Sequence, residues 1–155
     1  MTRHQRWLVA AIAGLGGMLL CSRAEAAPNC SISTTAVSFG VYNVFSATPT
    51  DSTGTITFKC TGNASNITVT LSKGTSTTFT PRTLTSGSNT LNYNLFTDAA
   101  RSTIWGDTTS GTSRYVNASP ANNQNIVVTV YWRITAGQDV SAGSYSDSIT
   151  ATINF

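Results

Sequence analysis

The chain of 155 residues contains little charge, with 9 Lys and Arg, 6 Asp and Glu, and a charged fraction of 10%. An average soluble protein has about 25% charged residues. This scarcity excludes a charged low-complexity tail and the dense cationic face with which many proteins bind nucleic acid. Histidine and glutamate occur once each, as His4 and Glu25, so side chains for acid–base catalysis are also scarce.

Beyond residue 26 the only acids are aspartates, which limits the chemistry that the chain can perform. A Ser–His–Asp triad lacks its histidine, and a glycosidase pair would have to come from scattered aspartates. Asp98 and Asp107 flank a Trp105-Gly106 turn, where we expect them to cap backbone amides. The sequence has no aspartate-rich loop of the kind that holds calcium. Two cysteines without histidine are too few ligands for zinc. The sequence therefore predicts a protein that is not an enzyme and has no metal or cofactor.

The N-terminus has the three parts of a secretory signal. Arg3–Arg6 is positively charged, and Leu8–Leu20 is an apolar run of thirteen residues, too short to span a bilayer comfortably. Ala24-Glu25-Ala26 fits a small-x-small cleavage signal, so cleavage is expected between Ala26 and Ala27. The alternative is a short membrane anchor. We expect a signal peptide over residues 1–26 and one mature domain over residues 27–155.

Two of the three cysteines remain after this cleavage, Cys30 and Cys60, because Cys21 lies within the predicted signal peptide. An even cysteine count in an exported protein indicates a disulfide, and the alternative is two buried free thiols. Closing a loop of about 31 residues would contribute roughly 3.5–4 kcal/mol in the chain-entropy model.

Hydroxyl side chains dominate the mature region, in which Ser and Thr account for 44 of 129 residues. No window shows a helical period, whereas apolar and polar residues alternate repeatedly, as they do in half-buried strands. Strands with one polar and one apolar face are typical of an antiparallel sandwich. The strands predicted in this way are 31–39, 55–60, 67–72, 91–96, 126–134 and 149–155.

The strand count leaves one question open. An immunoglobulin-like sandwich has at least seven strands, whereas the alternation predicts six. Residues 73–90 and 98–125 form long gaps that could hide a short strand. Otherwise one sheet edge is unpaired beside an apolar core. Such an edge can pair with other chains and aggregate, and proteins normally protect it. The prediction is an all-β, immunoglobulin-like antiparallel sandwich that lacks its last strand, with a hidden strand as the alternative.

Seven stretches of the mature region together resemble the spore coat protein U domain family, which includes the Csu-type pilins of archaic chaperone–usher pili. Their order and spacing carry the resemblance, and no single stretch is specific. They are Cys30–Ser33, Val37–Tyr42, Gly54–Thr61, Arg82–Leu84, Leu91–Asp98, Trp105-Gly106 and Gln138–Asp147.

This resemblance implies a sandwich without its final strand and a role as a fimbrial subunit. In the family a periplasmic chaperone lends a strand, and at the outer-membrane usher another pilus subunit replaces it with its N-terminal extension. The protein would then pass through the periplasm to the cell surface and support adhesion or biofilm formation. The residues expected to line the donor-strand groove, most of which would also serve as ordinary core, are Phe58, Val128, Val130, Ile149, Ala151, Ile153 and Phe155.

The chain departs from polymerising members of the family at its N-terminus. Those subunits have an extension of alternating apolar residues before the first domain cysteine. Here only Ala27, Pro28 and Asn29 separate the predicted cleavage site from Cys30, and three residues span about 10 Å. The subunit is therefore expected to accept a strand but to donate none, as at a pilus tip, although tip subunits of the family usually have two domains.

Two other functions remain open at this level. Trp105 and Tyr115 lie in the long gap and could stack on sugar rings, which would make the protein a secreted carbohydrate-binding module. A coat protein of a resting cell is suggested only by the family name. A complete seventh strand in the structure would favour the carbohydrate-binding module.

We expect the exported protein to begin near Ala27 and to contain the disulfide. Intact mass spectrometry of periplasmic material should give the mass of residues 27–155, two mass units below that of the reduced chain. Two thiols that react with an alkylating reagent in the native protein would contradict the disulfide. A mass that includes residues 1–26 would instead support the membrane anchor.

Overall fold

Residues 26–155 are described by the computed structural model, so the signal prediction, apart from Ala26, lies outside the described residues. The described region contains strands and no helix, and hence no helix that could cross a membrane. The strands are β1 (Asn29–Thr34), β2 (Thr50–Thr61), β3 (Ile67–Leu71), β4 (Arg82–Ser86), β5 (Asn89–Phe96), β6 (Tyr115–Asn117), β7 (Asn125–Ile134) and β8 (Ala151–Asn154).

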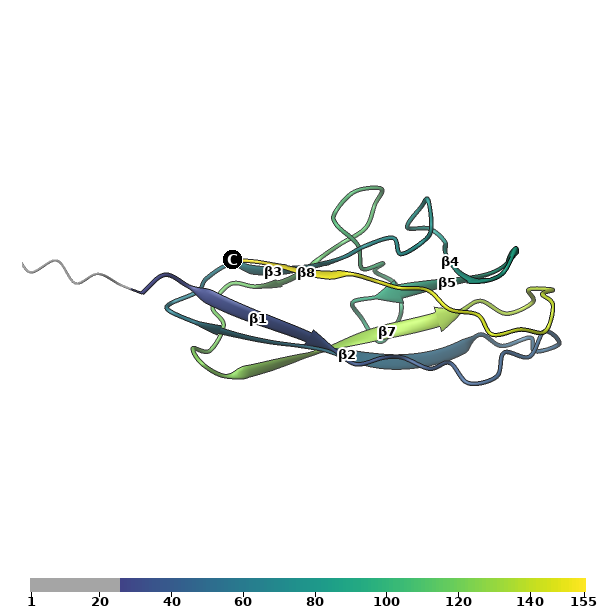
Figure 1. Ribbon diagram of the computed structural model, residues 1–155, viewed down its shortest axis with the longest axis horizontal. Coiled ribbons are helices and arrows are strands. Elements are labelled where there is room, and N and C mark those ends of the chain that lie inside the picture. The colour runs from purple at the N-terminus through teal and green to yellow at the C-terminus, as the bar shows by residue number, and fades with distance from the viewer. Residues whose placement is uncertain (1–25) are drawn as a thin grey trace, which may run out of the picture.

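The strands form two antiparallel sheets (Figure 1). The larger sheet has the order β1-β2-β7-β5-β4, and the smaller sheet has the order β6-β3-β8. β2 and β7 pair over ten residues, from Thr50 opposite Ile134 to Lys59 opposite Asn125. The architecture confirms the predicted all-β, immunoglobulin-like antiparallel sandwich.

The structure corrects the strand prediction in several places. β2 begins at Thr50 rather than at residue 55, and β8 covers Ala151–Asn154 rather than residues 149–155. Both long gaps contain a short strand, β4 in the first and β6 in the second. The sequence does not predict these two strands because three to five residues are too few to show a clear alternation. β1 also ends at Thr34, so residues 35–39 are not part of a strand. β4 extends the larger sheet beyond β5, and β6 pairs with β3 on the side opposite β8. Neither new strand lies against the outer edge of β8.

The apolar positions of the predicted alternation fill the space between the sheets. Ile67, Val69 and Leu71 of β3 are each buried, and so are Leu91, Tyr93 and Leu95 of β5. The intervening threonines of β3, Thr68 and Thr70, lie at partly exposed positions. The disulfide joins Cys30 of β1 to Cys60 of β2, which are directly paired in the sheet with a Cα–Cα distance of 4.1 Å. This confirms the disulfide.

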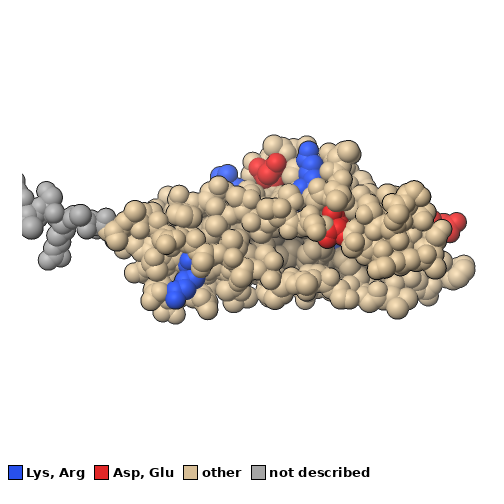
Figure 2. Space-filling model, viewed as in Figure 1, with Lys and Arg blue, Asp and Glu red and all other residues tan. Residues whose placement is uncertain are grey.

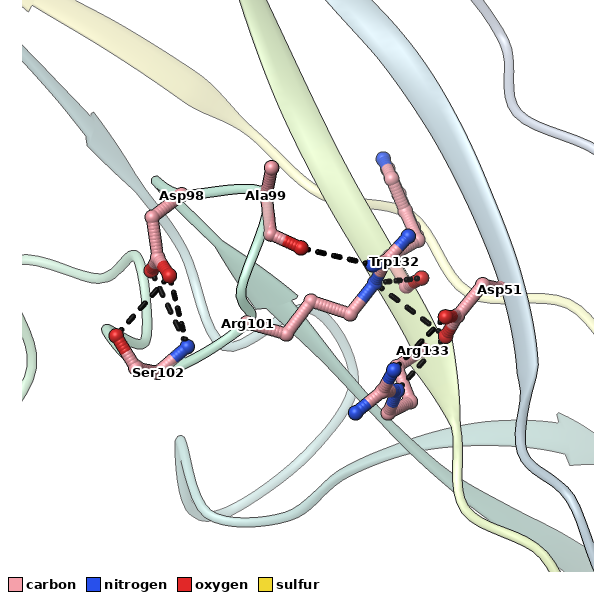
Figure 3. A network of polar contacts seen from close by, with 7 residues as sticks. All are labelled: Asp51, Asp98, Ala99, Arg101, Ser102, Trp132 and Arg133. Atoms are coloured by element: carbon pink, nitrogen blue, oxygen red, sulfur yellow. Dashed lines mark hydrogen bonds and ion pairs between the residues drawn. The ribbon is translucent and has the colours of Figure 1, made fainter.

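Charged side chains are few and scattered over the face drawn in Figure 2. On the larger sheet, Asp51 of β2 accepts two hydrogen bonds from Arg133 of β7, at 2.7 and 2.8 Å. Arg101 lies 3.3 Å from the same carboxylate and donates to the main-chain oxygens of Ala99 and Trp132 (Figure 3). The hydrogen bond from Arg133, together with the positive charge of Arg101, lowers the pKa of Asp51. The network therefore fastens the loop after β5 to β2 and β7.

Arg82 is the one charged side chain among the described residues that is fully buried. Its guanidinium donates twice to the main-chain oxygen of Ser72, at 3.0 and 2.9 Å, and once to that of Trp105, at 2.7 Å. A further nitrogen donates to Asn94 Oδ1 at 2.8 Å. Burial lowers the Arg82 pKa to about 10, so it remains charged at neutral pH. Arg82 thus connects β4 and β5 to the end of β3.

Replacing Arg82 with Met should destabilise the fold by about 3–5 kcal/mol, because three buried acceptors lose their donor. Arg82→Lys should recover little of this stability, since the ammonium group of lysine cannot reproduce the planar set of N–H donors of a guanidinium group. Chemical denaturation of the oxidised protein measures the difference. The control is Arg114→Met at an exposed position, for which a change within about 0.5 kcal/mol is expected. Equal stability of the two variants would contradict the role assigned to Arg82.

Candidate functional site

A long groove of about 1350 Å³ opens between two irregular segments of the chain. The first wall is residues 34–45, which continue from β1, and the second wall is residues 140–149, which lead into β8. Both segments can be followed in Figure 1 by the bar colours. The floor is apolar and comes from both sheets; it comprises Ile56, Leu71, Leu84, Leu91, Leu95, Val130 and Ile134.

The groove is bordered by an unpaired strand edge. β8 pairs with β3 on one side, and on the other side it has no strand partner within residues 26–155. β1 is likewise the edge strand of its sheet, and no β1–β8 ladder closes the gap. An edge strand presents a row of free main-chain N–H and C=O groups. The groove thus combines an apolar floor with main-chain groups that an added strand could pair with.

The first wall is attached mainly at its two ends. Thr35 N donates to Thr55 O at 3.0 Å, and near the other end the Tyr42 hydroxyl donates to Thr135 O and accepts from Gln138 N. Between them, no backbone–backbone hydrogen bond joins residues 36–42 to the rest of the described chain. Val41 and Phe45 are each 92% exposed. This wall is therefore an apolar segment with little main-chain pairing.

The second wall is held by Asp147 and by two main-chain hydrogen bonds between Ser146 and Thr85 of β4, at 2.9 and 3.0 Å. One carboxylate oxygen of Asp147 accepts from the Thr75 N–H, the Thr75 hydroxyl and the Ser148 N–H at 2.8 to 3.0 Å. The other accepts from the Tyr93 hydroxyl at 2.7 Å, and burial together with this bond raises the Tyr93 pKa. At Gly74 a Cβ atom would lie 2.1 Å from Asp147 Oδ2, so only glycine leaves room for the carboxylate. Asp147 thus connects the wall to β5 and to the loop after β3.

The residues expected in the groove occupy three different environments. Val130, Ile149 and Ala151 line it. Phe58 is 1% exposed and packs edge-on against Tyr115, at 6.1 Å between ring centroids, in the core beyond the groove. The remaining positions are outside the lining: Val128 and Ile153 are partly buried, and Phe155 is 53% exposed.

Sequence reasoning missed most of the groove. The alternation predicts strand up to residue 39 in the first wall, and it identifies the floor residues Leu71, Leu91 and Leu95 only as apolar strand positions; Leu84 lies in the gap 73–90, where no strand is predicted. Val41 and Phe45 are the sequence signal that could have indicated this wall. They are apolar residues outside the alternating apolar positions of the predicted strands.

The sugar-stacking hypothesis for Trp105 is wrong, since this side chain is 0% exposed and donates from Nε1 to Val69 O at 2.9 Å. Tyr115 is half-buried and packs against the Trp105 and Phe58 rings. Both belong to the packing of the core.

Asp98 and Asp107 each cap a turn in the structure. Asp98 accepts from the N–H groups of Ser102 and Thr103, and these bonds lower its pKa. Asp107 accepts from the Thr109 hydroxyl and N–H, which lower its pKa in the same way. Among the described residues, no group of three His, Cys, Asp or Glu side chains could hold a metal ion.

These features define an immunoglobulin-like domain with an open apolar groove along a free strand edge. Residues 18–152 match the Spore Coat Protein U domain, and the chain belongs to this family. No curated protein matched the chain.

A solved structure shares the fold: a chain of the CsuC–CsuE chaperone–tip adhesion subunit pre-assembly complex from archaic chaperone–usher Csu pili of Acinetobacter baumannii. The identity is 24% and the TM-score 0.56. The match covers 83% of this chain and 40% of the other, so the protein spans less than half of the chain it resembles.

Removing the Asp147 carboxylate should loosen the second wall. In Asp147→Ala, the Thr75 and Ser148 N–H groups and the Tyr93 hydroxyl lose their acceptor. We therefore expect the free energy of unfolding to fall by about 2–4 kcal/mol. Hydrogen exchange should accelerate at Thr75 and Ser148, and Asp147→Asn should show a smaller effect. Asp139→Ala, at an exposed position just before this wall, is the control. Unchanged exchange in Asp147→Ala would show that the wall is held by other contacts.

Proposed function

We propose that the protein is a pilus subunit whose groove accepts a β-strand from another protein chain. The observation that carries this proposal is the free edge of β8 beside an apolar groove of about 1350 Å³. Strand addition at such an edge gains affinity from main-chain hydrogen bonds and specificity from alternating side-chain pockets. The role is structural, and the proposal needs no catalytic residue or cofactor.

The family and the similar fold support a particular route of assembly. The related Csu structure is a pre-assembly complex between a chaperone and a tip adhesion subunit. By analogy, a periplasmic chaperone would fill the groove first, and the outer-membrane usher would exchange it for a strand of another pilus subunit. The exported protein would reach the cell surface within the pilus and support adhesion or biofilm formation there.

The short N-terminus supports a position at the end of the fibre. β1 begins at Asn29, which pairs with Thr61, so of the residues after the predicted cleavage site only Ala27 and Pro28 precede the sheet. Two residues cannot form a donor strand, and proline lacks the amide hydrogen that such a strand would use. The subunit would therefore accept a strand without donating one, which is the position of a tip subunit.

The test of acceptance is capture of a synthetic peptide that copies the N-terminal extension of a pilus subunit encoded beside this protein. Ile149→Asp should weaken capture at least about tenfold, because an unpaired charge would be buried in the groove. Val127→Asp is the matched control, since Val127 is 61% exposed and does not line the groove. Lack of capture by the unmodified protein, or equal weakening by both substitutions, would contradict the proposal.

The direction of assembly is tested by the converse mixture, with this protein offered as the donor to the neighbouring subunit. No complex is expected. Long homopolymers of this protein alone would refute the tip position, although acceptance of a strand would still stand.

A further inference from the structure

The Trp132 indole is the one buried side-chain donor within residues 26–155 that has no hydrogen-bond partner. Trp132 lies in β7 and lines the groove. Other polar groups near it are paired: the Tyr93 hydroxyl with Asp147, the Tyr42 hydroxyl with Thr135, and the Ser38 carbonyl with Ser52. The Trp105 indole, which lies outside the groove lining, also has its acceptor. A missing partner is therefore specific to the groove.

The Trp132 ring is held in place by two aromatic neighbours. It stacks on Tyr93 with 5.8 Å between centroids and an interplanar angle of 8°. Phe39 of the first wall meets it edge-on, at 5.7 Å and 72°. A ring fixed in this way cannot rotate freely to bring its N–H group to solvent, so the acceptor has to come to the ring.

Because residue 54 is a glycine, the Val37 side chain can occupy the space beside the indole nitrogen. A Cβ atom on Gly54 of β2 would lie 3.4 Å from Trp132 Nε1 and only 2.4 Å from Val37 Cγ2. Gly54 thus leaves a hollow that the Val37 side chain enters. Val37 belongs to the part of the first wall without backbone–backbone hydrogen bonds, where the adjacent Ser38 carbonyl accepts one hydrogen bond from the Ser52 hydroxyl at 3.0 Å. A strand that enters the groove can take the place of this side chain.

We propose that Trp132 Nε1 is a specificity-determining donor of the groove, which selects an incoming strand with a Ser or Thr hydroxyl at the position above Gly54. This inference rests on the strand-accepting function proposed above. The rest of the floor is apolar, so it distinguishes between incoming strands only by the size and shape of their side chains. A hydroxyl oxygen at this one position gives the buried N–H group its missing acceptor, whereas valine of the same shape leaves it unpaired.

The experiment scans a synthetic strand peptide that has valine at every inward position and serine at every outward position. Each inward valine is replaced in turn by threonine, and binding to the oxidised protein is measured by competition. One position should bind about tenfold more tightly with threonine, the change expected when a buried donor gains its acceptor. At the other inward positions threonine should weaken binding, since its hydroxyl would be buried against apolar side chains.

Trp132→Phe keeps an aromatic ring and removes the N–H group, so it should abolish the threonine preference while peptides still bind. The control is Trp105→Phe, which removes an indole N–H from the core outside the groove and should leave the preference intact. In the unmodified protein, the Trp132 indole proton should shift downfield in NMR spectra when the threonine peptide binds. This readout does not require the Trp132 variant to fold.

The outcomes separate the two proposals. If no peptide binds, the strand-accepting function itself fails. If peptides bind but no position prefers threonine, or if the preference survives in Trp132→Phe, the role of Trp132 is overturned and strand acceptance stands. An indole proton that does not move on binding of the preferred peptide would overturn it as well.

Discussion

The buried guanidinium of Arg82 is the interaction on which the closed side of the sandwich depends. It satisfies the carbonyl oxygens of Ser72 and Trp105 and the Asn94 side chain, and so joins the far strands of the larger sheet to the end of β3. Asp147 then links β5 to the segment that leads into β8. Polar contacts therefore hold both sheets together on one side, which allows the other side to remain open without loss of the fold.

The open side of the sandwich contains the apolar groove. The free edge of β8 and the weakly paired first wall leave room for a strand, which would lie along the groove above the buried floor residues Leu84, Leu91 and Ile134. Aggregation is the ordinary hazard of such an edge, and a partner that binds only the folded state reduces it by mass action. The proposed passage from chaperone to neighbouring subunit is consistent with this need.

Much of the fold was predictable because alternation reports burial directly. The stripes in β3, β5 and β7 place Val69, Leu91 and Val130 between the sheets, as expected. β4 and β6 escaped prediction because they are short and lie in serine- and threonine-rich sequence with little periodic contrast. The groove residues were harder still: Phe58 and Val130 both alternate with polar neighbours, yet Val130 lines the groove and Phe58 does not.

The sequence by itself determined the class of the protein: a strand-rich domain with a cysteine pair, little charge, and family motifs in order. Tertiary structure alone decided which edge is open and what surrounds it. Trp105 and Trp132 illustrate the difference, because both are tryptophans, yet one donates to Val69 and the other has no acceptor. The physical reason is that hydrogen-bond partners of buried groups come from residues distant in sequence, and local periodicity contains no information about them.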